Sequence, residues 1–473
     1  MTALLIDFGS TYTKLRAVEL DPPAVVASGQ GPSTVTTNVM VGMDLALADL
    51  EKRMGSLPDF SCRLACSSAA GGLRMVTIGL VRELTAEAAR QAALGAGARL
   101  VGTFAQHLTG DDVERIVELA PDILLLAGGT DGGNREVILH NAAVLATSPL
   151  DCAIIVAGNR AAAGDVEARL AKAGKPVLVT ENVMPEFGEL NIESARAAIR
   201  KVFIERIVHA KGIDRAASRL DAVLMPTPAA VMEAARLLAE GCDGLDGLGP
   251  LVLVDIGGAT TDVHSIAAGA PTESGVIVQG LPEPYVKRTV EGDLGLRYNA
   301  RSIVDAAGLE SIAAEAGVTG KRVGDLVEQL TQNVEHLPGS KEEQATEVAL
   351  ARAAVRFAVK RHAGTIETVY TVTGPVTVQR GKDLRETGMI IGTGGPLVHA
   401  PNPAFILKGA LADPTEPLSL RPRRPRLMLD RGYLLYAVGL LSTVDRAAAF
   451  TLARQQLQHI SEEKADGPSA ATS

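Results

Sequence analysis

The chain has 473 residues, of which 47% are hydrophobic, and its formal net charge at neutral pH is −9. That length accommodates two or three domains with substantial cores. Aromatic residues make up only 3% and tryptophan is absent, so a broad basic face or an aromatic stacking platform for nucleic acid is not expected.

The cysteines and the apolar runs exclude further classes. None of the four cysteines belongs to a Cys-x-x-Cys pair, which argues against a zinc site, an iron–sulfur cluster or a disulfide framework. The first predicted strand follows Met1 almost directly, which leaves no room for a signal peptide, and no apolar run reaches the roughly 18 residues of a membrane span. We therefore expect a cytoplasmic protein that binds neither nucleic acid nor membrane.

The first twenty residues predict a strand, a phosphate-type turn and a second strand that returns antiparallel. Asp7 ends the apolar strand, and the turn after it carries Gly9, Ser10, Thr11 and Lys14. Glycine permits main-chain N–H groups to approach a phosphate closely, and hydroxyl groups add donors. A third strand near 24–28 and a helix near 41–53 would complete a small α/β lobe. A strand–turn–strand unit over 63–81 follows, and we expect the first lobe to occupy residues 1–84.

From residue 85 to 180 the pattern changes to regular alternation of strands and helices. Strands are predicted at 99–104, 122–127, 152–157 and 176–180, and helices at 86–94, 111–119, 135–146 and 161–173. Such alternation indicates a parallel, doubly wound sheet, here an inserted α/β subdomain. The loop Ala127–Asn134 lies where open α/β sheets place ligands, and it is either a ligand contact or a tight β–α turn.

Residues 181–248 read as a mostly helical connection that completes the first lobe, and the second lobe is expected over 249–464. It opens on Leu251-Val-Leu-Val-Asp-Ile-Gly-Gly-Ala-Thr-Thr-Asp-Val263, which repeats the scheme of the N-terminus. Asp255 ends an apolar strand and is placed to hold Mg²⁺ directly or through water. The turn that follows supplies backbone and hydroxyl donors from Gly257, Gly258, Thr260 and Thr261. Two such turns in one chain suggest two similar lobes that grip one polyphosphate.

Several later segments of the second lobe have more than one interpretation. Glu291, Asp293 and Arg297 either face phosphates and metal or form a solvated loop or structural ion pair. Helices are expected within 302–362 and a strand at 368–373. The stretch 389–399 is a third strand–glycine–helix junction. The basic run 421–426 is either an exposed loop or a contact for an acidic partner, and the tail 465–473 is expected to be disordered.

Three glycine junctions in this order resemble the actin/Hsp70/sugar-kinase superfamily. That resemblance implies a two-lobed actin/Hsp70-like (ribonuclease H-like) ATPase fold of the α/β class that binds ATP or ADP with Mg²⁺. By this resemblance, the β- and γ-phosphates would contact Gly9, Ser10, Thr11 and Lys14, and the second phosphate loop would comprise Gly257, Gly258, Thr260 and Thr261. Asp7 and Asp255 would hold Mg²⁺ through waters, and Asp262 would orient the attacking water. The adenosine would pack against Gly392, Gly394 and Gly395. A capping or turn role for Asp262 is the alternative. Such a site suits phosphoryl transfer, which needs positioning and neutralised charge more than a covalent nucleophile.

At the level of the whole chain, the sequence looks like the GlmL/MutL family of glutamate mutase (methylaspartate mutase) accessory proteins, which is distinct from the similarly named mismatch-repair protein. The pieces that carry the resemblance are 7–14, 67–81, 124–134, 255–265, 291–297 and 392–397. The resemblance implies an ATP-dependent, chaperone-like reactivating factor whose protein partner is an adenosylcobalamin-dependent mutase. No cobalamin-binding Asp-x-His-x-x-Gly signature is visible, so the cobalamin is expected to stay with the partner.

Two other readings remain open at this stage. One is a small-molecule enzyme, either a metabolite kinase with Asp293 as a candidate base or an ATP-dependent amidohydrolase of the hydantoinase/oxoprolinase type. The other is a nucleotide-sensing scaffold without appreciable turnover. The sequence also leaves open whether the protein forms a homodimer.

Overall fold

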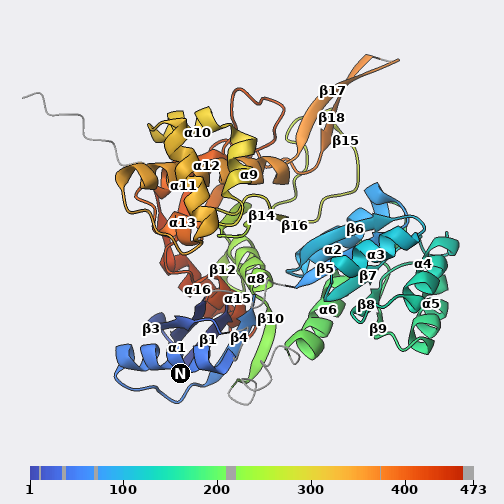
Figure 1. Ribbon diagram of the computed structural model, residues 1–473, viewed down its shortest axis with the longest axis horizontal. Helices are drawn as coiled ribbons and strands as arrows, with labels where there is room; N and C mark the ends of the chain where they lie inside the picture. Colours follow the sequence, from blue (N-terminus) through green and yellow to red (C-terminus); the bar gives the residue numbers. More distant parts are fainter. Residues whose placement is uncertain (10–11, 35–38, 69–72, 209–219, 373, 462–473) are drawn as a thin grey trace, which may run out of the picture. The chain divides into compact units, whose positions relative to one another are not determined.

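The computed structural model describes residues 1–9, 12–34, 39–68, 73–208, 220–372 and 374–461. The chain divides into two compact units (Figure 1). Unit 1 comprises residues 1–248, 278–288 and 434–455, and unit 2 comprises 249–277, 289–433 and the residues from 456 onward. Within the described ranges, no helix combines the length and apolar character that crossing a bilayer requires.

The first sheet of unit 1 has five strands in the order β3-β2-β1-β4-β10. Strands β1, β2 and β3 are antiparallel neighbours, whereas β4 and β10 run parallel to β1. Its strands are β1 (Thr2–Phe8), β2 (Tyr12–Leu20), β3 (Pro23–Pro32), β4 (Cys62–Ser67) and β10 (Ala222–Pro226). Helix α1 (Val39–Met54) packs on β2 and β3, and α15 (Leu435–Leu441) packs on β1 and β4. Two further helices, α8 (Thr227–Glu240) and α16 (Arg446–Gln456), and the short pair β11 (Gly241–Cys242) and β12 (Leu245–Asp246) complete this part.

The second sheet of unit 1 is entirely parallel, in the order β6-β5-β7-β8-β9. Its strands are β5 (Arg74–Gly79), β6 (Arg99–Ala105), β7 (Ile123–Leu126), β8 (Ala153–Val156) and β9 (Val177–Val179). Its helical segments are η1 (Arg82–Ala86), α2 (Glu87–Gly95), α3 (Gly110–Glu118), α4 (Glu136–Thr147), α5 (Arg160–Lys172), α6 (Glu193–Val202) and η2 (Phe203–Val208).

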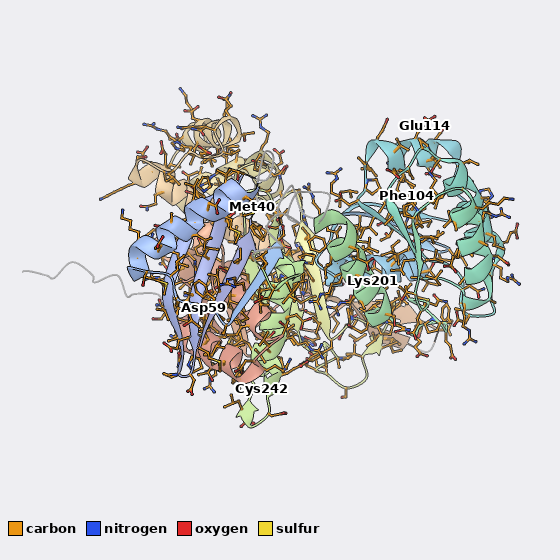
Figure 2. All side chains as sticks on the ribbon, turned by 90° about the horizontal axis from the view of Figure 1, so that it is seen from below. Met40, Asp59, Phe104, Glu114, Lys201 and Cys242 are labelled. Atoms are coloured by element: carbon orange, nitrogen blue, oxygen red, sulfur yellow. The ribbon has the colours of Figure 1, made fainter. Side chains whose placement is uncertain are left out.

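Helices cover both faces of this parallel sheet, as the alternation in the sequence predicted. Apolar residues of α3, α4 and α5 form one core with strand residues such as Leu124 and Ile154. Residues of α2 and α6 pack with Leu125 and Ile155, whose side chains point to the opposite face. Phe104 of β6 is buried in the first of these cores, whereas Glu114 of α3 is exposed (both labelled in Figure 2). The inserted subdomain is therefore doubly wound.

Two strands lie where the sequence pattern indicated otherwise. Strand β5 belongs to the parallel sheet, which therefore begins before residue 85. Strand β10 lies in a stretch that the alanine-rich composition indicated to be helical, and it forms the edge of the first sheet. Both are short strands whose place depends on pairing with distant residues, which local propensity does not report.

The main sheet of unit 2 has six strands in the order β16-β14-β13-β19-β20-β21, and its edge strand β16 begins in residues counted with unit 1. Its strands are β13 (Leu251–Ile256), β14 (Thr261–Ile266), β16 (Val286–Glu291), β19 (Met389–Thr393), β20 (Arg426–Asp430) and β21 (Leu457–His459). Its helices are α9 (Ala300–Ala307), α10 (Leu309–Ala316), α11 (Gly320–Gln332), α12 (Lys341–His362), α13 (Gly395–Val398), α14 (Pro403–Leu407) and η3 (Lys408–Ala410). A small sheet of β15 (Ile277–Val278), β18 (Gly374–Arg380) and β17 (Thr365–Thr371) extends from these helices (Figure 1).

The main sheets of the two units share one topology. If the strands of each of these two sheets are numbered in chain order, the first five follow the order 3-2-1-4-5 in both, with strands 1 and 2 antiparallel and strand 4 parallel to strand 1. This is the order of the ribonuclease H-like fold, so the two-lobed α/β architecture expected from the sequence is confirmed. In each sheet, strand 1 ends at an aspartate turn: Asp7 near the end of β1 and Asp255 near the end of β13.

Candidate functional site

Asp7 sits one residue before the end of β1 and is almost completely buried, with 4% of its surface exposed. Its Oδ1 accepts a hydrogen bond of 2.6 Å from the hydroxyl of Thr227, the first residue of α8. The thiol of Cys66 on the neighbouring strand β4 lies 3.7 Å from the same oxygen. In the β1–β2 ladder, Asp7 faces Lys14.

Burial raises the pKa of the Asp7 carboxyl above its ordinary value. The positive charge of Lys14 and the hydrogen bond from Thr227 act in the opposite direction, because both favour the ionised form. Among the described residues, the Thr227 hydroxyl and the Cys66 thiol both act on Oδ1, so Oδ2 retains acceptor capacity, which suits a metal ion or its bound water.

The turn after Asp7 is tight at Gly9. Its N–H donates to the carbonyl of Tyr12 over 3.1 Å, and its own carbonyl accepts a 2.6 Å hydrogen bond from the Ser33 hydroxyl. A Cβ added at Gly9 would lie 2.5 Å from the Tyr12 carbonyl oxygen, so the turn requires glycine. Ser10 and Thr11 lie outside the described residues.

In unit 2 the second turn brings two aspartates side by side. Asp255 on β13 faces Asp262 on β14 across the antiparallel ladder. The loop between them closes through a 2.9 Å hydrogen bond from Gly257 N–H to the Thr260 carbonyl. The Thr260 hydroxyl donates to Asp262 Oδ2 over 3.0 Å, which orients that carboxylate.

Thr261, the first residue of β14, differs from its half-buried neighbour Thr260. Its side chain is fully buried, and its hydroxyl donates to the Leu294 carbonyl over 2.7 Å. The hydroxyl faces the interior, because Thr261 and Asp262 are adjacent residues of a strand and point to opposite sides. The structure thus gives Thr261 a structural contact where the sequence pattern indicated a phosphate donor.

The segment 294–299 donates backbone hydrogen bonds to the carbonyls of this second turn. The carbonyl of Gly257 accepts from Leu296 N–H over 3.1 Å, and the carbonyl of Gly258 accepts from Arg297 N–H over 2.8 Å. With their carbonyls tied to this segment, the two glycines keep one turn geometry. The Arg297 guanidinium itself pairs with Glu347 at 2.5 Å.

The third junction lies beside Asp255 in the same unit. Strand β19 pairs in parallel with β13 and sets Thr393 opposite Asp255. Gly394 follows with φ of +101°, and a Cβ there would lie 2.2 Å from the Ile256 carbonyl oxygen and 2.9 Å from Asp255 Oδ1. The junction and the aspartate turn therefore form one continuous surface, for which Gly394 is required.

The other two glycines of the junction have different surroundings. A Cβ at Gly392 would meet the side chains of Leu397 and Leu407, so this glycine serves close packing of the strand against α13 and α14. Gly395 begins α13, and a Cβ there would lie 3.5 Å from the hydroxyl of Tyr433. Of the three, Gly394 and Gly395 are the ones at the aspartate turn.

The sequence analysis missed three residues at these turns. Thr227 holds Asp7, as described above. Asp430, buried at the end of β20, accepts a 3.2 Å hydrogen bond from the Thr393 hydroxyl. The pKa of Tyr433 is raised by burial and by the negative charges of Asp255 and Asp430. Their signal in the sequence was weak, because each lies far along the chain from the turn that it joins.

Glu291 and Asp293 form an ion-pair cluster with Arg361. Its guanidinium donates to both oxygens of Asp293 at 2.7 and 2.9 Å and to Glu291 at 2.8 Å. The hydrogen bonds from Arg361 lower the pKa of Asp293. A carboxylate held in this way is a poor general base, because its charged form is already stabilised.

The loop Ala127–Asn134 of the inserted sheet satisfies its own polar groups. The Asn159 side chain accepts from Gly132 N–H and donates to the carbonyls of Gly133 and Asn134, all at 3.1 Å. Asn182 donates to the Gly129 carbonyl and to Asp131 at 3.0 Å. These hydrogen bonds fix the conformation of the loop, as in a tight β–α turn.

Each aspartate turn, taken by itself, has a carboxylate of the kind that magnesium uses. Among the described residues, no group of three or more histidine, cysteine, aspartate or glutamate side chains is arranged to hold a metal. Magnesium is commonly bound through one or two carboxylates, with waters and phosphate oxygens completing its six ligands. Asp7 in unit 1 and Asp255 in unit 2 are carboxylates of this kind.

Comparison with known proteins places the sequence in a described family. The sequence profile of that family, described as "MutL protein", matches residues 3–457. The protein named "Protein MutL" from Clostridium tetanomorphum is 47% identical over 440 residues, which is 93% of this chain and 95% of the relative.

Solved structures match at much lower similarity. A ligand-bound xylulose kinase from Lactobacillus acidophilus is 11% identical, with 97% of this chain and 93% of that chain covered and a TM-score of 0.36. A glycerol dehydratase reactivase is 11% identical, with 94% and 99% covered and a TM-score of 0.34. Scores of this size do not establish a common arrangement, so the architecture rests on the strand order within each unit.

Proposed function

The chain belongs to the MutL protein family, and we propose that it is an ATP-binding accessory factor that hydrolyses ATP slowly and reactivates an adenosylcobalamin-dependent mutase of the glutamate mutase type. One observation carries the nucleotide part of this proposal. Two sheets of the same 3-2-1-4-5 order each end their first strand in an aspartate followed by a glycine turn. Such paired turns are suited to the two sides of a polyphosphate.

The residues take the following roles in this proposal. The glycines Gly9, Gly257 and Gly258 let the two turns approach the phosphates of ATP or ADP closely, and the hydroxyls of Ser10 and Thr11 and the Lys14 ammonium bind these phosphates. Thr260 orients Asp262. Asp7 and Asp255 hold Mg²⁺ through its water ligands, and the ion neutralises charge on the phosphates. Gly394 and Gly395 leave room for the adenosine.

In this proposal Asp262 orients the attacking water. The hydrogen bond from the Thr260 hydroxyl to Oδ2 supports that role, because it fixes the orientation of the carboxylate. Hydrolysis then depends on orientation of that water and on neutralised phosphate charge. Slow turnover fits a factor that signals to its partner through whether ATP or ADP is bound, and not through the product that it releases.

The structure favours this function over a metabolite kinase that uses Asp293. A kinase needs a base beside the acceptor hydroxyl. Asp293 instead shares Arg361 with Glu291, and its pKa is lowered. No described residue gives specific support to an amidohydrolase.

The test is ATP turnover by the purified protein, alone and with an inactivated adenosylcobalamin mutase. We expect slow turnover that rises with the mutase, together with recovery of mutase activity. Asp262→Asn should retain ATP binding and lower turnover by roughly 10²-fold. Asp305→Asn, an exposed aspartate on α9, is the matched control. Turnover that ignores the mutase but rises with a small acceptor would contradict the proposal, and normal turnover in Asp262→Asn would return Asp262 to a structural role.

A further inference from the structure

Unit 2 contains a pocket that is not part of the aspartate turns. It has a volume of about 340 Å³ and lies between α10, α12 and the segment that follows α14. Four cationic side chains and two carboxylates line it: Arg352, Arg356, Lys408, Arg421, Glu315 and Asp413. An excess of cations in one pocket is unusual for a chain whose net charge is −9.

Arg421 is the most unusual of these residues, because it is fully buried. Buried arginine is rare in proteins unless its charge is paired and its donors are satisfied. One end of its guanidinium pairs with Glu416 at 2.7 Å. Its Nε, however, is buried and has no hydrogen-bond acceptor among the described residues. A buried donor without an acceptor is unusual in native structures, and Arg421 lines the pocket, so an anion bound there is one source of the missing acceptor.

Arg356 provides a second available guanidinium. Its side chain is half-buried, and its guanidinium carbon lies 4.7 Å from the centre of the Phe357 ring. Within the described ranges it forms neither a hydrogen bond nor an ion pair. All the donors of this guanidinium therefore remain open to a ligand.

The two carboxylates of the pocket are already engaged. Glu315 pairs with Arg352 at 3.5 Å. Asp413 accepts hydrogen bonds from the backbone N–H and the hydroxyl of Thr415 at 2.8 and 2.7 Å. Both also interact electrostatically with Arg356, but the four cations that line the pocket outnumber its two carboxylates, so positive charge remains at the pocket.

We propose that this pocket binds a small, doubly charged oxyanion through Arg356, Lys408 and Arg421. Arginine guanidinium groups match the planar or tetrahedral oxygens of carboxylate and phosphate, and burial strengthens such charge-assisted bonds. A volume of about 340 Å³ is large enough for an anion of this size and lies at the small end of ligand pockets. The site is independent of nucleotide binding, since it uses none of the residues of the turns.

The experiment titrates the full chain with inorganic phosphate and, separately, with succinate, at constant ionic strength with chloride as the reference salt. Calorimetry and thermal melting follow binding. We expect saturable binding of at least one dianion at millimolar concentration. Arg356→Gln should weaken it roughly tenfold, the loss of one charge-assisted contact. The exposed Arg424→Gln, outside the pocket, is the charge-matched control and should bind as the unmodified chain does.

The two probes distinguish a phosphate ligand from a dicarboxylate. Lys408→Gln is a second variant should Arg356→Gln melt abnormally. Phosphate bound at the nucleotide turns instead would bind equally to both pocket variants and would be displaced by Mg·ADP, which overturns the proposal. Absence of saturable binding of either dianion to the unmodified chain also overturns it.

Discussion

At the scale of single residues, Asp7 combines a functional requirement with a cost in stability. Its carboxylate is buried and receives one hydroxyl donor, from Thr227. The Thr227 hydroxyl, the Cys66 thiol and the nearby Lys14 charge favour the ionised carboxylate, but less than the solvent from which burial removes it. The raised pKa of Asp7 expresses this imbalance. A magnesium ion supplied with a nucleotide would restore the missing positive charge.

Asp7→Asn should therefore raise the thermal stability of the ligand-free protein at neutral pH, by about 1 kcal/mol. Because the pKa of Asp7 is raised in the folded state, the folded protein binds this proton more tightly than the unfolded chain does. In the unmodified protein, the destabilisation caused by the Asp7 charge is thus complete above the pKa of Asp7 in the folded state. It disappears as the pH falls toward the pKa of Asp7 in the unfolded chain. Melting curves of both proteins from pH 8 to pH 4 should show the difference narrowing in acid. A difference independent of pH would contradict this account.

Thr227 offers a second prediction at the same scale. Thr227→Val removes the 2.6 Å hydrogen bond to Asp7 and leaves the shape of the side chain nearly unchanged. We expect Mg·ATP affinity to fall about tenfold, since a hydrogen bond to a charged group contributes roughly 1.5 kcal/mol or more. Thr227→Ser keeps the hydroxyl and is the control. Equal affinities for the two variants, measured by calorimetry, would show that the hydroxyl does not act on the site.

At the scale of elements, the three turns depend on positions where a strand ends and the backbone must approach another chain segment. Gly9 and Gly394 are such positions, since a Cβ at either would overlap a backbone oxygen. At the second turn, two adjacent threonines have different roles, because Thr260 lies in the loop and Thr261 begins β14. Thr260 reaches Asp262, whereas Thr261 points inward to Leu294.

Gly394→Ala should disrupt the third turn and the carboxylate beside it. The added Cβ would lie 2.2 Å from the Ile256 carbonyl oxygen, and a φ of +101° is strained for any residue with a Cβ. We expect a loss of about 2 kcal/mol in unfolding free energy and weaker nucleotide binding. Gly388→Ala is the control, because a Cβ there has no neighbour within 4 Å. Denaturant unfolding of both variants checks this, and equal stabilities would contradict it.

At the scale of the whole molecule, each unit brings one aspartate turn of the same topology. If both turns serve one nucleotide, removal of either carboxylate should weaken Mg·ATP binding. We expect Asp7→Ala and Asp255→Ala each to lower the affinity at least tenfold, and the double variant to lose less than the sum of the two free energies, because both lose the same metal ion. Calorimetric titration of the three variants tests this. Unchanged affinity in both single variants would exclude the two-turn site.

Several parts of the fold were accessible from the sequence because they depend on local patterns. The alternation of strands and helices from residue 99 to 180 gave a parallel, doubly wound sheet, since amphipathic helices and continuous apolar strands have distinct periods. The aspartate and glycine turns followed apolar strands directly, so their local shape was predictable. Strand β10 and the inclusion of β5 in the parallel sheet were not, because strand pairing joins residues far apart in the sequence.

By itself, the sequence determined the class of fold, the positions of three glycine turns and a resemblance to a family that the comparisons confirm. Only the tertiary structure decided which side chains meet at each turn. It joined Thr227 to Asp7 across 220 positions, set Asp430 and Tyr433 near Asp255, and tied Asp293 to Arg361. The physical reason is that a turn is fixed by its own backbone angles, whereas hydrogen bonds and charge depend on neighbours that only folding brings within a few ångströms.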